Sequence, residues 1–424
     1  MRRTTSLTAA ALVCLTVPGL ALLGPTAASG AAETCQGRTA TIVGSGHSVQ
    51  GTEGPDVILT NGARSVYAQG GNDLICISGP YTGKYYPVFV RSGNGNDVVD
   101  GTGSPRQEVY AFLAAGVDTF LGGDASDSVE LDYPDAASGV DTVDGGGGSD
   151  SIRIQTGPGD AVVDNEVGRF TSAGEVRTTW ADVEGFGIQQ SAGSQRLTFV
   201  GTDADESVGW SSSDAATVDV TLGRGDDHWS SSTPPTPSSR LFGGPGRDSI
   251  YLASEEAGID LDLPVGTMGV DAAAPYVVTA ADFEDADLFA PSVTVRGTDG
   301  PNDIGLTACT GVVRLGGGDD SVRRQYDSSF ETDIRCAETL TANGGSGDDK
   351  LSGTRGDDRL TGGSGKDVLK GGFGEDRLVG GRGHDRLVGQ ADADVLLGGR
   401  GRDTADGGTG RDRCKAERKQ CCEG

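Results

Sequence analysis

Eight nonapeptides follow one another without a break in residues 344–415: GGSGDDKLS, GTRGDDRLT, GGSGKDVLK, GGFGEDRLV, GGRGHDRLV, GQADADVLL, GGRGRDTAD and GGTGRDRCK. The sixth position is aspartate in every unit, and the eighth position is apolar in every unit. The aspartates are Asp349, Asp358, Asp367, Asp376, Asp385, Asp394, Asp403 and Asp412. A constant spacing of this kind indicates a repeat architecture, in which each unit supplies the same turn and the same strand.

The physical chemistry of one unit predicts its shape. Glycines at the first, second and fourth positions permit φ > 0 and a close approach of neighbouring backbones, so the first six residues should form a turn. The last three residues should form a short strand whose middle side chain points inward. One unit buries a single apolar side chain, which cannot offset the entropy lost on ordering, so the units must stack. We therefore expect an all-β fold, a parallel β-solenoid of the β-roll or β-helix type, with two nonapeptides in each coil.

The turns are rich in oxygen atoms that can bind a metal. An aspartate carboxylate beside glycine carbonyls is a set of hard donors, which suits Ca²⁺. Because Ca²⁺ needs about six to eight oxygens, more than one turn presents, each ion should lie between stacked turns. Two columns of four turns would then hold up to about six ions. Besides the eight aspartates, the candidate ligands are the turn residues Gly345, Gly347, Gly356, Gly363, Gly365, Gly372, Gly374, Gly381, Gly383, Gly399 and Gly401.

The pattern GGxGxDxUx resembles the RTX, or haemolysin-type, calcium-binding repeat. The match is close over residues 371–379 and 380–388. It departs from the pattern at Asp392, which replaces the fourth-position glycine, and it fades at Ala405 and Cys414, as terminal repeats often do. The resemblance implies a β-roll that binds Ca²⁺ in its turns.

Weaker copies of the repeat precede the array. GTEGPDVIL at 51–59 fits the pattern well, and the other upstream copies are separated by irregular insertions. The aspartates that these copies place in the sixth position are weaker candidate ligands: Asp56, Asp97, Asp150, Asp248 and Asp320. A longer duplication lies over them, since GGGGSDSI at residue 145 recurs as GGPGRDSI at residue 243, and LGRGDD at 222 recurs as LGGGDD at 315.

These boundaries predict the organisation of the chain. The predicted segments are a signal peptide (1–31), an irregular RTX-like β-solenoid (32–144), two duplicated solenoid blocks (145–322), a junction with a disulfide (323–343), the regular β-roll (344–415) and a tail (416–424). The signal peptide is predicted from Arg2 and Arg3, the apolar run 9–23 and the small residues 27–32. We therefore expect a secreted, extracellular protein.

Export implies an oxidising compartment, in which disulfides form. Seven cysteines would remain after cleavage of the signal peptide, so one thiol should stay unpaired. The predicted pairs are Cys35–Cys76, Cys309–Cys336, and Cys414 with either Cys421 or Cys422.

The charge of the chain bears on its partners. The net charge is −28, whereas the array 344–413, with 12 basic and 13 acidic residues, carries only −1. So acidic a surface argues against nucleic acid and anionic membrane as partners and favours cations. No later segment is long and apolar enough to predict a membrane span. Trp180, Trp210 and Trp229 are expected to fill the core rather than to form a sugar-stacking platform.

No catalytic residues are predicted. The chain lacks HExxH and GxSxG, which mark zinc proteases and serine hydrolases. The sequence therefore favours a secreted calcium-binding protein without enzymatic activity, with a structural or adhesive role and an unidentified extracellular protein or polysaccharide partner. The alternative is a polysaccharide-active enzyme of the lyase or epimerase kind, because parallel β-helices often carry such activities. The only cofactor expected is Ca²⁺.

Overall fold

The computed structural model describes residues 33–80, 86–131, 139–212, 216–324, 336 and 338–422. The predicted signal peptide lies outside these residues, and so does much of the predicted junction at 323–343. All regular elements in the described residues are β-strands, and no helix there could cross a membrane. The all-β prediction is confirmed.

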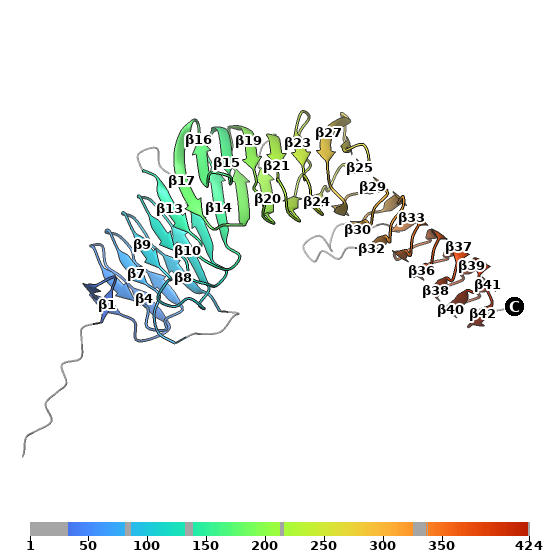
Figure 1. The fold of residues 1–424 in the computed structure, drawn as a ribbon, viewed down its shortest axis with the longest axis horizontal. Coiled ribbons are helices and arrows are strands. Elements are labelled where there is room, and N and C mark those ends of the chain that lie inside the picture. Colours follow the sequence, from blue (N-terminus) through green and yellow to red (C-terminus); the bar gives the residue numbers. More distant parts are fainter. Residues whose placement is uncertain are drawn as a thin grey trace, which may run out of the picture.

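Two long sheets of stacked parallel strands form the solenoid (Figure 1), and the chain alternates between them. A short antiparallel pair, β1 (Thr34–Cys35) and β2 (Arg38–Thr39), precedes them. Sheet 1 consists of β3 (Ile42–Val43), β5 (Val57–Leu59), β7 (Leu74–Cys76), β9 (Val98–Asp100), β11 (Thr119–Leu121), β13 (Asp141–Asp144), β15 (Gly159–Asp164), β16 (Arg169–Ser172), β17 (Glu175–Ala181), β19 (Ser194–Val200), β21 (Thr217–Thr221), β23 (Arg240–Phe242), β25 (Gly258–Asp262), β26 (Thr267–Asp271), β27 (Tyr276–Ala281), β29 (Ser292–Arg296), β31 (Thr310–Arg314), β33 (Thr339–Ser346), β35 (Arg359–Ser364), β37 (Arg377–Gly383), β39 (Val395–Gly401) and β41 (Arg413–Lys415).

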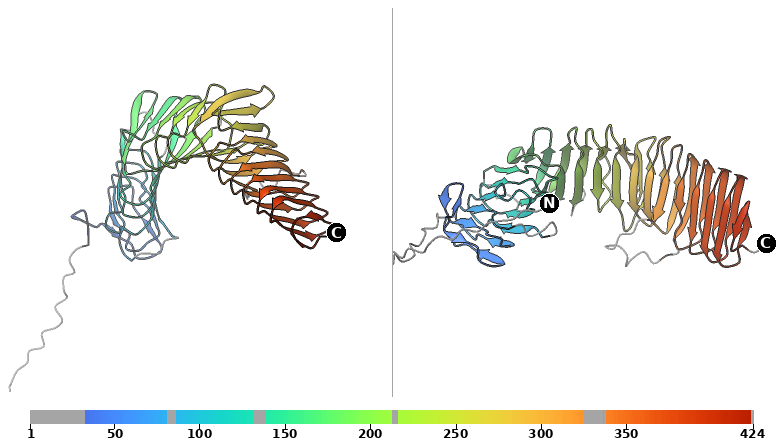
Figure 2. Two further views of the ribbon diagram at one scale, coloured as in Figure 1. Left: turned by 45° about the vertical axis from the view of Figure 1, so that its right-hand side comes forward. Right: turned by 60° about the horizontal axis from the view of Figure 1, so that its bottom comes forward.

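Sheet 2 consists of β4 (Ser48–Gln50), β6 (Ser65–Tyr67), β8 (Val88–Arg91), β10 (Val109–Leu113), β12 (Ser128–Leu131), β14 (Ser151–Thr156), β18 (Gly185–Gln190), β20 (Ser207–Ser212), β22 (His228–Ser231), β24 (Ser249–Ala253), β28 (Asp285–Phe289), β30 (Asp303–Thr307), β32 (Ser321–Arg324), β34 (Lys350–Ser352), β36 (Val368–Gly372), β38 (Arg386–Ala391), β40 (Thr404–Thr409) and β42 (Arg418–Gln420). The solenoid bends along its length, and Figures 1 and 2 show the strands of sheet 2 on the inner side of the bend.

The register in the array confirms two nonapeptides per coil. Leu351 pairs with Leu369 in sheet 2, and Leu360 pairs with Leu378 in sheet 1, so each partner lies 18 residues further along the chain. These leucines point between the sheets and are almost completely buried. They belong to one hydrophobic core that extends from Val49 to Ala405. The three tryptophans are also buried in this core, as predicted.

The duplicated blocks have a structural counterpart. In the first block, β16 is antiparallel to both β15 and β17, so the three strands insert a meander into the otherwise parallel sheet 1. In the second block, β26 is antiparallel to β25 and β27 in the same way. The two meanders explain why the spacing of the turns is irregular in this part of the sequence.

Three disulfides link parts of the described chain: Cys35–Cys76, Cys309–Cys336 and Cys414–Cys422. The third bond differs from the candidate Cys421, which is exposed and unpaired. Cys421 has a φ of 48°, and the chain turns there, so that Cys422 rather than Cys421 reaches Cys414. Sequence alone left these two alternatives open.

Candidate metal centre

Two columns of acidic residues line the edges of the sheets, because each sixth-position residue directly precedes a strand and the strands stack in register. Column 1, on sheet 1, holds Asp56, Asp73, Asp97, Asp118 and Asp141 in the N-terminal part and Asp358, Asp376, Asp394 and Asp412 in the array. Column 2, on sheet 2, holds Asp127, Asp150, Glu184, Glu206, Asp227, Asp248, Glu284, Asn302, Asp320, Asp349, Asp367, Asp385, Asp403 and Glu417.

One carboxylate oxygen of each array aspartate holds the stack together. Oδ1 of Asp385 accepts the backbone N–H of Asp367 at 3.0 Å, and the N–H of Asp385 donates to Asp403 Oδ1 at the same distance. The pattern continues upstream, where Asp97 Oδ1 accepts the N–H of Asp73 at 2.8 Å. At the C-terminal end, Glu417 takes over this role and accepts the N–H of Asp403 at 2.8 Å.

The second carboxylate oxygen is the feature that calls for a metal. In most turns Oδ2 is buried and has no hydrogen-bond partner among the described residues. The Oδ2 atoms in this state belong to Asp73, Asp97, Asp118, Asp227, Asp248, Asp320, Asp349, Asp367, Asp376, Asp385, Asp394, Asp403 and Asp412. A buried anionic oxygen without a partner is strongly destabilising, and native proteins rarely leave one uncompensated. The repetition of the same vacancy in hydrogen bonding indicates a common ligand.

Burial also changes the acidity of these carboxyl groups. Desolvation raises the pKa of Asp376 to about 8, although the hydrogen bond from the Asp358 backbone lowers it in part. Desolvation likewise raises the pKa of Asp118 to about 8 and that of Asp367 to about 7. Neighbouring carboxylates of the same column add to the increase. The turns therefore lack the positive charge that would keep these groups ionised.

Glycine carbonyls supply further oxygens. A Cβ atom on Gly363 would lie 2.1 Å from the carbonyl oxygen of Gly345, and one on Gly383 would lie 1.6 Å from that of Gly365. The carbonyls of the second and fourth positions therefore face the stacked turn, at a distance that only glycine tolerates. Since the φ angles of Gly363 and Gly383 are 123° and 140°, these positions favour glycine for two separate reasons.

The donor set fits Ca²⁺. Within the described residues, His, Cys, Asp and Glu side chains form no group of three or more that could hold a metal by themselves. An ion would thus take a carboxylate oxygen from the column and complete its shell with backbone carbonyls, which Ca²⁺ accepts and Zn²⁺ does not favour. In the array, the residues that would hold it are the column aspartates and the second- and fourth-position glycines.

The structure brings the eight array aspartates into the two predicted columns, all of them buried. Two candidates differ from the others, because Oδ2 of Asp56 and Oδ2 of Asp358 accept hydrogen bonds from their own turns. Sequence reasoning missed several column members, among them Glu184 and Glu284, which are glutamates rather than aspartates. Their equivalent places in the two duplicated blocks are the signal that could have identified them.

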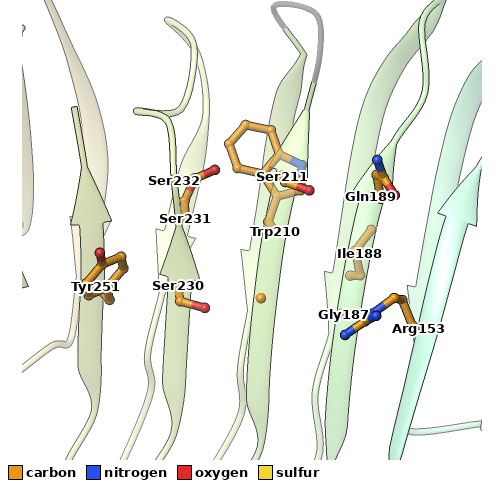
Figure 3. Close-up of a pocket in the computed structure, with 11 residues that line it drawn as sticks. Arg153, Gly187, Ile188, Gln189, Trp210, Ser211, Ser230, Ser231, Ser232 and Tyr251 are labelled. Carbon is orange, nitrogen blue, oxygen red and sulfur yellow. The ribbon is translucent and has the colours of Figure 1, made fainter. Parts of the chain in front are cut away.

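A separate cavity of about 490 Å³ lies on the outer face of sheet 2, across β14 to β24. Figure 3 shows Arg153 at one side and Tyr251 at the other, with Trp210 and Ser230 between them. Its lining residues are mainly serine, glycine and glutamine, without a carboxylate or a histidine. This cavity has no metal-binding donor set and is distinct from the columns.

Comparison with known proteins supports the metal assignment. The family model for the RTX calcium-binding nonapeptide repeat matches four copies, at residues 135–153, 343–378 and 379–414. No curated protein matches the chain. The matched segments include every nonapeptide of the array and the turn that contains Asp150.

Proposed function

We propose that this chain, which carries RTX calcium-binding repeats in a parallel β-solenoid, acts outside the cell as a Ca²⁺-stabilised structural or adhesive element without catalytic activity. The observation that carries the proposal is the row of buried carboxylate oxygens that have no hydrogen-bond partner. Without metal, these groups must either stay protonated or repel one another. Bound Ca²⁺ would neutralise them and join successive coils, so that metal binding and folding are coupled.

Circular dichroism of the full-length protein tests this coupling. The array should be largely disordered in chelator and should gain β-structure as Ca²⁺ rises through roughly 0.1–1 mM, the range of extracellular modules. Mg²⁺ is the matched control, since it is smaller and gives up its water ligands reluctantly. Spectra that do not change over the Ca²⁺ titration would refute the proposal.

Three disulfides support export, since such bonds persist in oxidising compartments. N-terminal sequencing of the chain recovered from the medium should begin just after Ala31 or Ala32. A chain that remains inside the producing cell, with Met1 retained and its thiols reduced, would contradict the assignment.

Exposed aromatic residues support an adhesive role. Tyr67 and Phe89 lie on the outer face of sheet 2, and with Tyr110 they line a cavity of about 470 Å³. Extended solenoid faces of this kind commonly bind partners. The partner would be an extracellular protein or polysaccharide. Binding to cell-surface extracts should be weakened in Phe89→Ala and unchanged in Phe373→Ala, which removes an equally exposed ring from the array.

The alternative function is a polysaccharide-active enzyme, and the cavity beside Arg153 and Tyr251 is the observation that favours it. Incubation with acidic polysaccharides, followed by ultraviolet detection of unsaturated uronates or by NMR for epimerised residues, separates the two functions. We expect no product. Product formation that is lost in Tyr251→Phe would establish the enzyme and overturn the non-catalytic assignment.

A further inference from the structure

Four turns carry threonine where the repeat has glycine in its second position. The turns are GTEGPD with Thr52, GTDADE with Thr202, GTDGPN with Thr298 and GTRGDD with Thr354. They occur in the N-terminal part, in both duplicated blocks and in the array, so the feature belongs to no single segment of the chain.

All four threonines form the same hydrogen bonds. The backbone N–H of Thr52 donates to Asp56 Oδ2 at 2.8 Å, and that of Thr354 donates to Asp358 Oδ2 at 2.5 Å. The threonine hydroxyl donates to the same carboxylate and accepts the N–H of the fourth turn residue, Gly54 or Gly356. The oxygen that elsewhere has no partner therefore has two donors from its own turn.

The other two threonine turns have replaced the aspartate itself. Thr298 donates its N–H to Asn302 Oδ1 at 2.8 Å, and the Asn302 amide donates to the Glu284 carbonyl at 2.6 Å, so this turn contains no carboxylate to neutralise. In the remaining turn, Thr202 donates to Glu206 Oε1 at 2.9 Å. Only Glu206 Oε2, on a side chain one methylene longer, stays without a partner among the described residues.

Backbone conformation separates the two kinds of turn. In the array the second residue of each turn with a free Oδ2 is left-handed, as at Gly381 with φ 119°, and even the non-glycine Gln390 has φ 84°. None of the four threonines has a positive φ. A β-branched residue strongly disfavours that region, so threonine keeps its N–H directed at the carboxylate. Gly123, which is also not left-handed, likewise donates to Asp127 Oδ2, at 3.1 Å.

The left-handed second residue is not an absolute requirement for a free oxygen. Asp118 and Asp320 also have unpartnered Oδ2 atoms, although Ala114 and Gly316 in their second positions are not left-handed. What the turns with a free oxygen share is that no donor of their own turn reaches Oδ2.

The places of the threonines have a physical reason. Asp56 and Asp358 are the first acidic residues of their runs in column 1, where the residues one coil earlier are Ala40 and Leu340. An ion held between two turns would find only one suitable turn there. Donors from the threonine compensate the carboxylate where a metal has no second turn to join.

We propose that the second residue of each turn decides whether the turn binds Ca²⁺: threonine closes the turn with its own donors, whereas a turn whose Oδ2 stays free takes an ion. The inference rests on the calcium-binding function proposed above. It adds Ca²⁺ sites outside the array, at Asp73, Asp97, Asp118, Asp227, Asp248 and Asp320, whose side chains are nine-tenths or more buried. It removes Asp56 and Asp358 from the ligands of the chain.

Counting bound Ca²⁺ on the full-length protein by native mass spectrometry, with total calcium measured after equilibrium dialysis, tests the rule. Thr354→Gly removes both threonine donors and permits φ > 0, so it should bind one ion more than the wild type. Thr354→Val is the matched control. It lacks the hydroxyl but stays β-branched, so its count should equal that of the wild type.

A second pair of variants tests the sites outside the array. Asp97→Asn should lose at least one ion, whereas Asp56→Asn should lose none. Asn302 shows that the fold accepts asparagine in a column, and circular dichroism of both variants checks this directly. Equal counts for Thr354→Gly and wild type, or equal losses in the two asparagine variants, would overturn the rule. A wild type that binds no Ca²⁺ at all would instead refute the proposed function.

Discussion

Replacing Gly383 by alanine tests how tightly the turns are stacked. The new Cβ atom would lie 1.6 Å from the carbonyl oxygen of Gly365, whereas an ordinary contact begins near 3.4 Å, so β35 and β37 would have to move apart at their ends. The backbone at Gly383 has φ 140°, which adds a conformational penalty of about 1–3 kcal/mol.

Gly174→Ala is the control for the conformational penalty. Gly174 is also left-handed, with φ 83°, but an added Cβ atom would meet nothing within 4 Å. Both substitutions therefore share the cost of the φ angle, and the difference between them reports the close approach. Loss of about two hydrogen bonds between coils predicts that Gly383→Ala is less stable by a further 1–3 kcal/mol, roughly.

Hydrogen exchange in excess Ca²⁺ measures this difference locally. Peptides that cover residues 359–401 should exchange faster in Gly383→Ala, and those around Gly174 should change little in either protein. Urea unfolding gives the corresponding free energies. If Gly383→Ala destabilises the array no more than Gly174→Ala destabilises its hairpin, the turns are not in the close contact that the columns require.

Three further outcomes are expected. Asp385 lies between two stacked turns and Asp412 lies at the end of its column, so Asp385→Ala should lose up to two ions and Asp412→Ala only one; equal losses in native mass spectrometry would mean that each turn binds its own ion. Because burial raises the pKa of Asp376 from 3.8 to about 8, its stabilising contribution in metal-free protein is present at low pH and is lost as the pH rises through about 8. Thermal unfolding of metal-depleted protein should therefore show higher stability near pH 5 than near pH 9, roughly, and excess Ca²⁺ should abolish or reverse this order, whereas a flat profile without metal would contradict it. Replacing Cys309 and Cys336 by serine should destabilise the protein by about 2–4 kcal/mol in chemical unfolding, and no change in stability would show that the bond constrains little.

The array could be predicted from sequence because one interaction dominates each of its positions. Leu360 and Leu378 must lie inside, Asp358 and Asp376 must precede their strands, and the nine-residue period then places both pairs 18 residues apart. The stacked columns follow from this register. No longer-range information is needed when each coil contacts only its neighbours.

The remaining features depend on geometry that residue types do not reveal. The consensus pattern does not distinguish Thr354 from the glycines, and the difference lies in a backbone angle that redirects one N–H group. Glu184 reaches the column because a longer side chain compensates for a different path of the turn. The meander of β15, β16 and β17 changes the sequence spacing without changing the stack, so a search for a constant period passes over it.

The C-terminal coil limits the size of the assembled particle. A solenoid ends in two exposed strand edges, which could template the addition of another molecule and lead to fibres. Here the last strands, β41 and β42, are only three residues long, and β42 presents Arg418 and Lys419 to solvent. The Cys414–Cys422 bond crosses this end, and Glu417 occupies the acceptor position that a further repeat would supply. The same stacking that lets coils follow one another within the chain is thereby prevented from continuing between chains, which protects a long, open-ended β-structure from aggregation.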